Sequence, residues 1–333
     1  MNRYLDHRTR IEKVLSGEKP DRLPISFWRH FPVDDQSPEG LARATLTFQK
    51  RYDLDFVKVT PSSSFCLKDF GVKDEWNGNT EGTRDYLEPI ISDVGDLKKI
   101  VKIDPRKGFL GKQLECLNII KQETPKDTPI LQTVFSPLSQ LKNLVGKSNL
   151  QSYVRLFPDE ILKALEVLTE ITNYFIAECK KLNIDGIFYA IQQASYDILS
   201  EKEYIKFGKS FDMKILSCTN SYWFNILHLH GNNVMFSIVA DYPCQVINWH
   251  DRDTPPSLKE ASSKTEMVLC GGLSRLLTML LGDERKISRE IGDAIEQTDG
   301  FRLILSTGCV LPITTPECNI SSARTFAEKR LIN

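Results

Sequence analysis

The sequence lacks any run of 18 apolar residues, so no segment is expected to cross a membrane as a helix. Its first eight residues are rich in charge and contain no apolar core of the kind that defines a signal peptide. The formal net charge is only −1, and no large basic field is present to attract nucleic acid or an anionic membrane. We therefore expect a cytoplasmic protein that binds neither nucleic acid nor membrane.

The eight cysteines include no CxxC pair and have no compact framework spacing. The missing pair removes support for a zinc ribbon or a thioredoxin-type redox site. In a chain of this length without a signal peptide, we expect the thiols to be reduced. With 41% hydrophobic and 26% charged residues, the composition is that of an ordinary globular protein.

Short apolar runs alternate with amphipathic stretches along the whole chain, which is the pattern of an α/β fold. Eight of these runs are predicted strands, at residues 21–28, 56–59, 130–135, 186–190, 224–230, 245–249, 266–270 and 302–305. Most are continuously apolar, as in a parallel sheet covered on both faces. They predict a single-domain (β/α)₈ TIM barrel over residues 1–333, with an N-terminal helix within 1–20 and an irregular insertion at 62–108.

A doubly wound open sheet is the competing fold, and it would place a glycine-rich phosphate-binding turn after the first strand. This chain has Trp28-Arg29-His30 at that place, without a glycine pattern. The barrel is therefore favoured. In barrels, catalytic residues gather where the strands end and the loops to the helices begin, so polar side chains at the predicted strand ends are the candidates for a site.

Two histidines lie at the end of the fifth predicted strand. Positions i and i+2 of a strand point to the same face, so His228 and His230 are expected to project together. Paired imidazoles suit a transition metal, although a single histidine near a strand end is more often a hydrogen-bonded rim residue. The candidate third ligand is Cys309, after the last predicted strand. Two imidazoles and one thiolate leave the fourth position of zinc open, as at catalytic sites, and Glu317 and Cys318 are possible fourth ligands.

Other polar side chains at predicted strand ends are candidates for substrate binding and catalysis: Arg29, His30, Gln192, Gln193 and His250. An arginine there suits bidentate binding of a carboxylate or phosphate, although a surface ion pair would explain it too. The glutamines could instead cap a helix, and His250 could be a hydrogen-bonded rim residue. Gly271 and Gly272 precede a predicted helix whose first amides would cradle the anionic group of a cofactor, although tight packing explains such a pair equally well.

Three motifs are similar to those of the uroporphyrinogen decarboxylase superfamily. They are Arg8-Thr9-Arg10 with Gly17-Glu18-Lys19-Pro20-Asp21-Arg22-Leu23-Pro24, the strand end His228-Leu229-His230-Gly231, and Gly308-Cys309-Val310-Leu311-Pro312 followed by Thr315-Pro316-Glu317-Cys318-Asn319-Ile320. The resemblance covers essentially the whole chain, and it implies a (β/α)₈ barrel.

The superfamily has two main chemistries. The true decarboxylases are metal-free, bind a tetrapyrrole through an RQAGRY segment, use an aspartate after an early strand, and carry a histidine where Cys309 stands. At the first two places this chain has Trp28-Arg29-His30-Phe31 and Thr60-Pro61-Ser62. The cobamide-dependent methyltransferases that act on thiols hold zinc with His-x-Cys and a distant cysteine. His228 and Cys309 match that pattern, whereas His230 stands in place of its first cysteine.

The chain thus resembles the methyltransferase branch more closely than the decarboxylases. The resemblance implies a zinc-dependent enzyme that moves a methyl group between a small substrate, either a methoxylated compound or a thiol, and a corrinoid carried by a partner protein. A homodimer is one assembly that the sequence allows. The alternatives left open are a decarboxylase of a tetrapyrrole or another polycarboxylate, a non-catalytic corrinoid or tetrapyrrole binder, and a generic zinc hydrolase.

Overall fold

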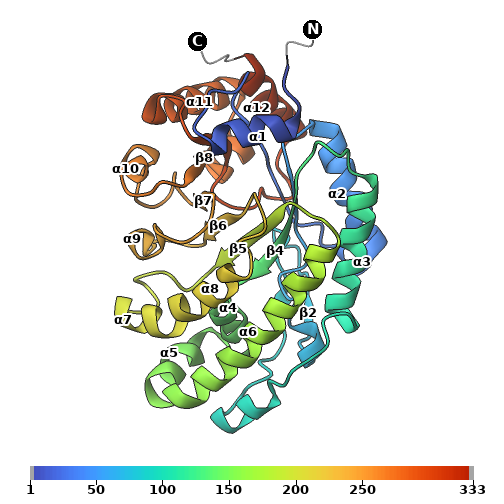
Figure 1. The fold of residues 1–333 in the computed structure, drawn as a ribbon, viewed down its shortest axis with the longest axis vertical. Coiled ribbons are helices and arrows are strands. Elements are labelled where there is room, and N and C mark those ends of the chain that lie inside the picture. Colours follow the sequence, from blue (N-terminus) through green and yellow to red (C-terminus); the bar gives the residue numbers. More distant parts are fainter. Residues whose placement is uncertain (1–3, 330–333) are drawn as a thin grey trace.

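Seven parallel strands form one curled sheet at the centre of the molecule, and helices cover its outer face (Figure 1). The computed structural model describes residues 4–329. Neighbouring strands follow the order β1 (Val57–Val59), β4 (Ile130–Phe135), β5 (Gly186–Ile191), β6 (Ile226–Leu229), β7 (Val246–Trp249), β8 (Val268–Leu273) and β9 (Leu303–Thr307). Because every neighbouring pair is parallel, the seven carboxyl ends lie at one edge of the sheet.

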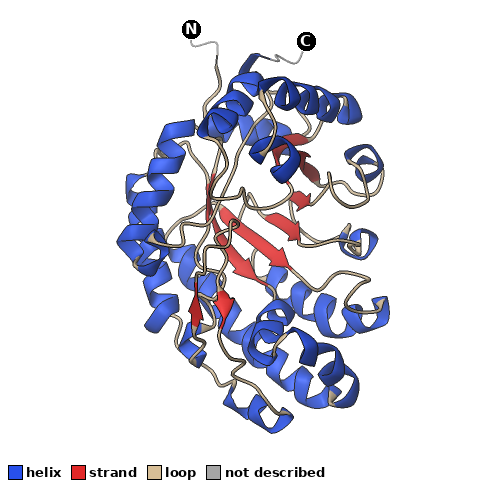
Figure 2. Ribbon diagram, turned by 180° about the vertical axis from the view of Figure 1, so that it is seen from behind, coloured by secondary structure: helices blue, strands red, loops and turns tan. Residues whose placement is uncertain are grey.

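The helices alternate with these strands, and Figure 2 shows them surrounding the sheet. They are α1 (His7–Leu15), α2 (Pro38–Tyr52), α3 (Gly108–Glu123), α4 (Pro137–Val145), α5 (Lys147–Leu156), α6 (Pro158–Lys181), α7 (Glu201–Tyr204), α8 (Ser210–Ser217), α9 (Phe236–Val239), α10 (Leu258–Ser262), α11 (Glu284–Thr298) and α12 (Glu317–Lys329). Three of them, α2, α4 and α6, begin with a proline, whose missing N–H has no partner in the first turn of a helix anyway. Within residues 4–329, no helix is both long and apolar enough to span a membrane.

The first predicted strand, at 21–28, is not a regular strand. Ile25 forms a single parallel bridge with Leu305 of β9, and its carbonyl accepts the Asp55 amide at 2.9 Å just before β1. The segment cannot extend its ladder, because Pro24 has no N–H and the Ile25 N–H is bound by the Asp55 carboxylate at 2.8 Å. The α/β fold with a parallel sheet is confirmed, but the sheet has seven strands, and the predicted eight-stranded barrel is not confirmed.

Side chains alternate between the two faces of the sheet, which produces two apolar layers. Outward side chains such as Val57 and Ile187 pack against the helices in a large outer core. Inward side chains such as Phe188 and Ile226 form a smaller inner core. On β6 the next inward position after Ile226 is His228, so the inner face becomes polar toward the carboxyl ends of the strands.

The predicted insertion at 62–108 contains the short helices η2 (Lys68–Phe70) and η3 (Val94–Lys99) and an antiparallel pair, β2 (Asp74–Glu75) with β3 (Asp85–Tyr86). Buried ion pairs hold this pair of strands in place: Arg84 contacts Asp35 at 2.8 Å and Asp74 at 3.6 Å. The turn between the two strands reaches the segment after β9, where the Ile313 amide donates to the Thr80 carbonyl at 2.7 Å.

Three helical segments differ from a simple continuous helix or from the expected bounds. Residues 201–217 form α7, a π-helical turn η4 (Ile205–Lys209) and α8, which ends at Ser217. The N-terminal helix expected within 1–20 begins at His7, because the Asp6 side chain caps it by accepting the Thr9 amide; residues 1–3 lie outside the described part. The last helix, α12, begins at Glu317, and residues 330–333 after it lie outside the described part.

Buried ion pairs fix the N-terminal helix to the amino end of the sheet. The fully buried Asp55 carboxylate accepts hydrogen bonds from Arg10 and Arg22, each at 2.6 Å. His7 Nδ1 lies 3.0 Å from the same carboxylate. Burial acts to raise the pKa of Asp55, but the His7 and arginine contacts hold it well below its usual range.

Candidate metal centre

Three histidines and one cysteine meet at the carboxyl edge of the sheet. The group comprises His228 on β6, His230 directly after it, His250 directly after β7, and Cys309 in the turn after β9, and its candidate ligand atoms all lie within 4.8 Å of one another. Cys309 Sγ is 3.9 Å from His228 Nε2 and 3.6 Å from His230 Nδ1. The predicted convergence of two imidazoles and a distant thiol is therefore present, and His250 joins it as a fourth group.

The strand register explains why His250 joins. His228 is paired in register with Asn248 on the neighbouring strand β7. Two residues further along each strand, His230 and His250 face each other, with ring centroids 5.2 Å apart. We predicted His250 as a catalytic residue, and its position makes it a candidate metal ligand.

Gly308 allows the turn that carries Cys309 to approach β7 closely. A Cβ atom at this position would lie 2.5 Å from the Trp249 carbonyl oxygen and 2.5 Å from His250 Cα. Any side chain would therefore push the turn, and with it Cys309, away from the histidines. This contact gives a physical reason for the Gly-Cys sequence of the motif.

A hydrogen bond behind the cluster orients the ring of His228, and a carboxylate lies near the ring of His250. His228 Nδ1 lies 2.7 Å from Asn248 Oδ1, so this nitrogen donates and leaves the lone pair of Nε2 directed toward Cys309. The Asn248 amide is itself fixed, because its Nδ2 donates to the carbonyls of Cys270 at 2.8 Å and Thr307 at 3.1 Å. His250 Nδ1 is 3.7 Å from Asp253, and its Nε2 is buried without a hydrogen-bond partner in the described structure. Metal-binding histidines are typically supported through the second ring nitrogen in this way.

The electrostatics of the cluster favour a thiolate. Burial acts to raise the pKa of the Cys309 thiol, but the neighbouring rings of His228, His230 and His250 hold it well below its usual range. Burial lowers the pKa of His228, which favours the neutral ring. Burial also acts to lower the pKa of His230, but its contact with Cys309 raises it. Thiolate and neutral imidazole are the metal-binding forms of these side chains, and a set of nitrogen and sulfur donors suits zinc. The four residues thus fit a zinc ion by their chemistry and their mutual distances.

A small cavity of about 80 Å³ adjoins the cluster. Its apolar wall includes Trp28, Phe135 and Phe188, and its polar wall includes His30, Lys58, Thr60, Ser63, Glu81, Thr133 and Gln192. The turn of the β2–β3 pair closes one side, and Gly82 packs so closely that a Cβ atom there would lie 2.7 Å from His30 Cβ. The cavity is far smaller than the roughly 300–1,000 Å³ of pockets for drug-sized ligands.

Lys58 is a cavity residue that our sequence analysis missed. It lies on the inward face of β1, is only 8% exposed, and places its ammonium 4.6 Å from the ring centroid of Phe188 and 5.9 Å from that of Trp28. Burial lowers its pKa to about 7. A charged residue within the apolar run Phe56-Val57-Lys58-Val59 was the signal that could have identified it.

Of the predicted site residues that follow the first and fourth predicted strands, some line the cavity and others do not. His30 and Gln192 line the cavity, and burial, assisted by Lys58, lowers the pKa of His30 to about 4. Gln193 is buried but does not line the cavity. Arg29 does not line the cavity: its guanidinium lies 5.2 Å from the ring centroids of Phe31 and Phe48 and donates to the Ile313 carbonyl at 3.3 Å.

The predicted anion cradle at Gly271 and Gly272 is also wrong, because both glycines lie inside β8 rather than before a helix. The Gly272 N–H is bound by the Asp251 carboxylate at 3.0 Å, and its carbonyl accepts hydrogen bonds from Arg252. A Cβ atom on Gly271 would lie 2.4 Å from Asp251 Oδ1. Close packing of this carboxylate explains the glycine pair.

Neither predicted fourth ligand belongs to the cluster. Glu317 forms an ion pair with Arg51 at the start of α12. Cys318 is exposed on the same helix, with its Sγ 3.8 Å from Asn319 Oδ1. Within the described residues, His250 takes the place that we assigned to them.

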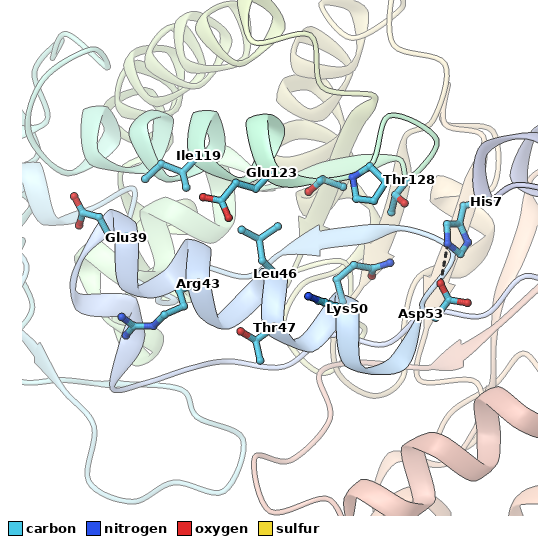
Figure 3. Close-up of a pocket in the computed structure, with 13 residues that line it drawn as sticks. His7, Glu39, Arg43, Leu46, Thr47, Lys50, Asp53, Ile119, Glu123 and Thr128 are labelled. Atoms are coloured by element: carbon cyan, nitrogen blue, oxygen red, sulfur yellow. Dashed lines mark hydrogen bonds and ion pairs between the residues drawn. The ribbon is translucent and has the colours of Figure 1, made fainter.

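A larger groove, of about 1010 Å³, lies on the surface between α2 and α3 (Figure 3). None of the four cluster residues lines it. Its histidine, His7, is already paired with Asp53 at 3.1 Å, as the dashed line in Figure 3 marks. The residues that line the groove therefore do not form a group of metal-binding side chains like that of the cluster.

The chain belongs to the uroporphyrinogen decarboxylase (URO-D) family, whose sequence pattern matches residues 6–329. Two similar proteins are named methylcobamide:CoM methyltransferase MtbA: that of Methanosarcina acetivorans is 21% identical and that of Methanosarcina mazei 22% identical, each over 94% of this chain and 95% of the relative. The predicted family, with its greater similarity to the methyltransferase branch, is confirmed.

Two solved structures share the fold. A methyltransferase from Methanosarcina mazei superimposes with a TM-score of 0.85 at 22% identity, over 98% of this chain and 99% of that one. A B12-independent methionine synthase from Shewanella sp. W3-18-1 superimposes with a TM-score of 0.55 at 12% identity, over 93% and 92% of the two chains.

Proposed function

We propose that this protein is a zinc-dependent methyltransferase that moves a methyl group between a small substrate and a corrinoid carried by a partner protein. The observation that carries the proposal is the meeting of His228, His230, His250 and Cys309 at one point of the sheet edge. The names of the two MtbA relatives, which cover nearly the whole chain, support corrinoid-linked methyl transfer.

In this proposal, His228, His230 and Cys309 hold the zinc ion, and His250 supplies the fourth donor in the substrate-free protein. A bound zinc ion lowers the pKa of a substrate thiol and holds it as a nucleophile at neutral pH. The chain's own contribution is orientation: Asn248 fixes the ring of His228, and Gly308 lets Cys309 reach the histidines. One thiolate with three imidazoles donates less charge than two thiolates, so the ion would be more electrophilic than in a His-x-Cys site.

The cavity beside the cluster supports a small substrate, either a thiol or a methoxylated compound. A volume of about 80 Å³ does not accommodate a tetrapyrrole. Arg29, the anchor that we expected for a decarboxylase, does not line the cavity; its guanidinium lies 5.2 Å from the ring centroids of Phe31 and Phe48. The turn at Gly82 packs on His30 and closes one side of the site.

We also infer that the segment around Ile25 completes a (β/α)₈ barrel as its eighth strand, although it forms only one bridge. Its hydrogen bonds on both sides, to Leu305 of β9 and to the Asp55 amide before β1, support closure. Closure would fix the distance between β6, β7 and the turn after β9, and so the geometry of the metal site. The homodimer stays a prediction.

Metal analysis of the purified protein is the first test. We expect about one zinc ion per chain in the wild type and little in Cys309→Ala. Cys179→Ala is a matched control, because Cys179 is equally buried but lies on α6 away from the cluster; it should retain the metal. A wild type without zinc, or Cys309→Ala with undiminished zinc, would remove the mechanism.

Turnover assays separate the proposed reaction from its rivals. With the zinc-loaded protein, we expect a thiol to be methylated from a methylated corrinoid, or a methoxylated compound to be demethylated onto a reduced corrinoid. Loss of either reaction in Cys309→Ala supports the proposal. Metal-free conversion of uroporphyrinogen to coproporphyrinogen would instead establish the decarboxylase, and a stable corrinoid spectrum without turnover would establish a binder.

A further inference from the structure

Arg29 is a half-buried cation that forms no ion pair with any residue of the described structure. Its guanidinium lies 5.2 Å from the ring centroids of Phe31 and Phe48, and its Nη1 donates to the Ile313 carbonyl at 3.3 Å. The Nε–H is buried and has no hydrogen-bond partner within residues 4–329. Burying an unpaired cation is unfavourable, and cation–π contacts recover only part of that free energy.

The acidic side chains around Arg29 are engaged elsewhere. Burial lowers the pKa of Arg29, and Glu317 and Asp34 act to raise it without touching the guanidinium. Glu317 forms its ion pair with Arg51, and Asp34 forms its own with Arg43. The positive charge of Arg29 is therefore not compensated by a carboxylate in contact with it.

A small pocket of about 20 Å³ adjoins Arg29, and none of the four cluster residues lines it. Thr45 of α2 lines the same pocket, is only 6% exposed, and its hydroxyl is buried without a partner in the described part of the chain. Most of the remaining wall is apolar and comes from Phe27, Phe31, Phe48, Leu54 and Phe56. Two buried donors, the Nε–H of Arg29 and the hydroxyl of Thr45, thus lack acceptors beside one pocket.

The other polar side chains at this pocket bring no negative charge to it. Gln49 Nε2 donates to the Leu54 carbonyl at 2.5 Å. Lys58 borders both the pocket and the cavity beside the cluster, but its ammonium lies 4.6 Å from the ring centroid of Phe188, which lines the cavity and not the pocket. No acidic side chain is among the described residues that line the pocket.

The chemistry of the pocket favours an anion over a water molecule. A volume of about 20 Å³ holds a single guest of about the size of water, which excludes phosphate, sulfate and organic acids. A water molecule could accept from Arg29 and Thr45, but its own two hydrogens would then face a largely apolar wall. A monatomic anion accepts from both donors, requires no acceptor, and compensates the charge of the guanidinium.

We propose that this pocket is a chloride site, in which the ion accepts hydrogen bonds from Arg29 Nε and Thr45 Oγ1. The ion would join α2 to the segment around Arg29 and, through the Ile313 contact, to the segment that follows Cys309. It would therefore stabilise the fold beside the site without lining the substrate cavity. The inference depends neither on zinc nor on the proposed methyl transfer.

Bromide locates the site directly, because it replaces chloride and scatters X-rays anomalously. Crystals grown without halide would be soaked in sodium bromide, with data collected at the bromine absorption edge. We expect an anomalous peak in the pocket, in contact with Arg29 Nε and Thr45 Oγ1. A water molecule that persists there in bromide, or a pocket without any density, would overturn the proposal.

Thermal unfolding shows whether the protein binds chloride in solution. Chloride would be exchanged for gluconate at constant ionic strength, since gluconate is too large for the pocket. Above the dissociation constant, we expect each tenfold increase in chloride to raise Tm by about 2–4 °C. The same Tm in both salts would show that bromide in the crystal is only an adventitious ion.

Substitutions assign the effect to the pocket. Arg29→Met should abolish the chloride dependence of Tm, and Thr45→Val should at least halve it. In gluconate, Thr45→Val should be as stable as the wild type or more stable, because it replaces an unsatisfied hydroxyl by a methyl group. Thr169→Val is the matched control: Thr169 is equally buried on α6, but its hydroxyl donates to the Leu165 carbonyl at 2.7 Å. A chloride response that survives in Arg29→Met and Thr45→Val, or that is lost in Thr169→Val, contradicts the assignment.

Discussion

Asn248 should set the metal affinity of the cluster without touching the metal. Its Oδ1 accepts from His228 Nδ1 at 2.7 Å, and its Nδ2 donates to the carbonyls of Cys270 and Thr307 at 2.8 and 3.1 Å. Asn248→Leu removes all three hydrogen bonds while retaining much of the side-chain volume. The His228 ring would then lose the contact that holds its orientation and selects its tautomer.

The expected magnitude follows from the kind of contact removed. Loss of such a supporting group typically weakens metal binding about 10- to 100-fold, which corresponds to about 1.4–2.8 kcal/mol. The substitution also removes two hydrogen bonds to backbone carbonyls, each contributing about 0.5–1.5 kcal/mol, so the free energy of unfolding should fall as well. The two effects have to be measured separately.

Competition with a chromophoric chelator measures zinc affinity, and urea denaturation measures stability. Asn319→Leu is the matched control, since the buried Asn319 amide likewise donates to two backbone carbonyls, those of Met279 and Gly282 at 3.0 and 2.9 Å, but contacts no histidine. We expect both variants to be destabilised and only Asn248→Leu to lose zinc affinity. Affinity unchanged within about twofold in Asn248→Leu, or equally reduced in Asn319→Leu, would refute the reasoning.

Three further predictions concern the rest of the chain. Asp55→Ala should lower the free energy of unfolding by about 3–5 kcal/mol in urea denaturation, because it removes the buried carboxylate partner of Arg22 and leaves Arg10 with Asp21 alone; a change below about 1 kcal/mol would contradict this. Burial acts to lower the pKa of His7, but two carboxylates raise it from 6.5 to about 9, so its contribution to stability should be complete below pH 6.5 and disappear as the pH rises through 9; His7→Gln should flatten this part of the stability profile, and an unchanged profile would count against it. Arg29→Met should leave substrate affinity within about twofold of the wild type, because the side chain points away from the cavity; a large loss in a binding titration would show that it reaches the substrate.

Local patterns were sufficient to predict most of the fold and the centre of the site. Continuous apolar runs predicted each of the seven strands, and the two-residue period of a strand placed His228 and His230 on one face. The distant Cys309 could be predicted because it follows the last predicted strand, and the resemblance to a known family supported the choice. Its position depends on a close contact of Gly308 with β7, which no local pattern reveals.

Features that depend on tertiary contacts were not predictable. The strand at 21–28 fails to form because the Asp55 side chain binds the Ile25 N–H. His250 enters the cluster because of the register between β6 and β7, whereas Arg29 does not line the cavity and instead donates to the Ile313 carbonyl. Lys58 was overlooked, although a charged residue inside an apolar strand is unusual enough to be noticed.

X-ray absorption spectroscopy of the zinc-loaded protein tests the central claim most directly. We predict imidazole nitrogens at about 2.0–2.1 Å and one sulfur at about 2.3 Å, with the sulfur contribution absent from any metal retained by Cys309→Ser. A spectrum of the wild type without sulfur, or one that is identical in Cys309→Ser, would contradict the account.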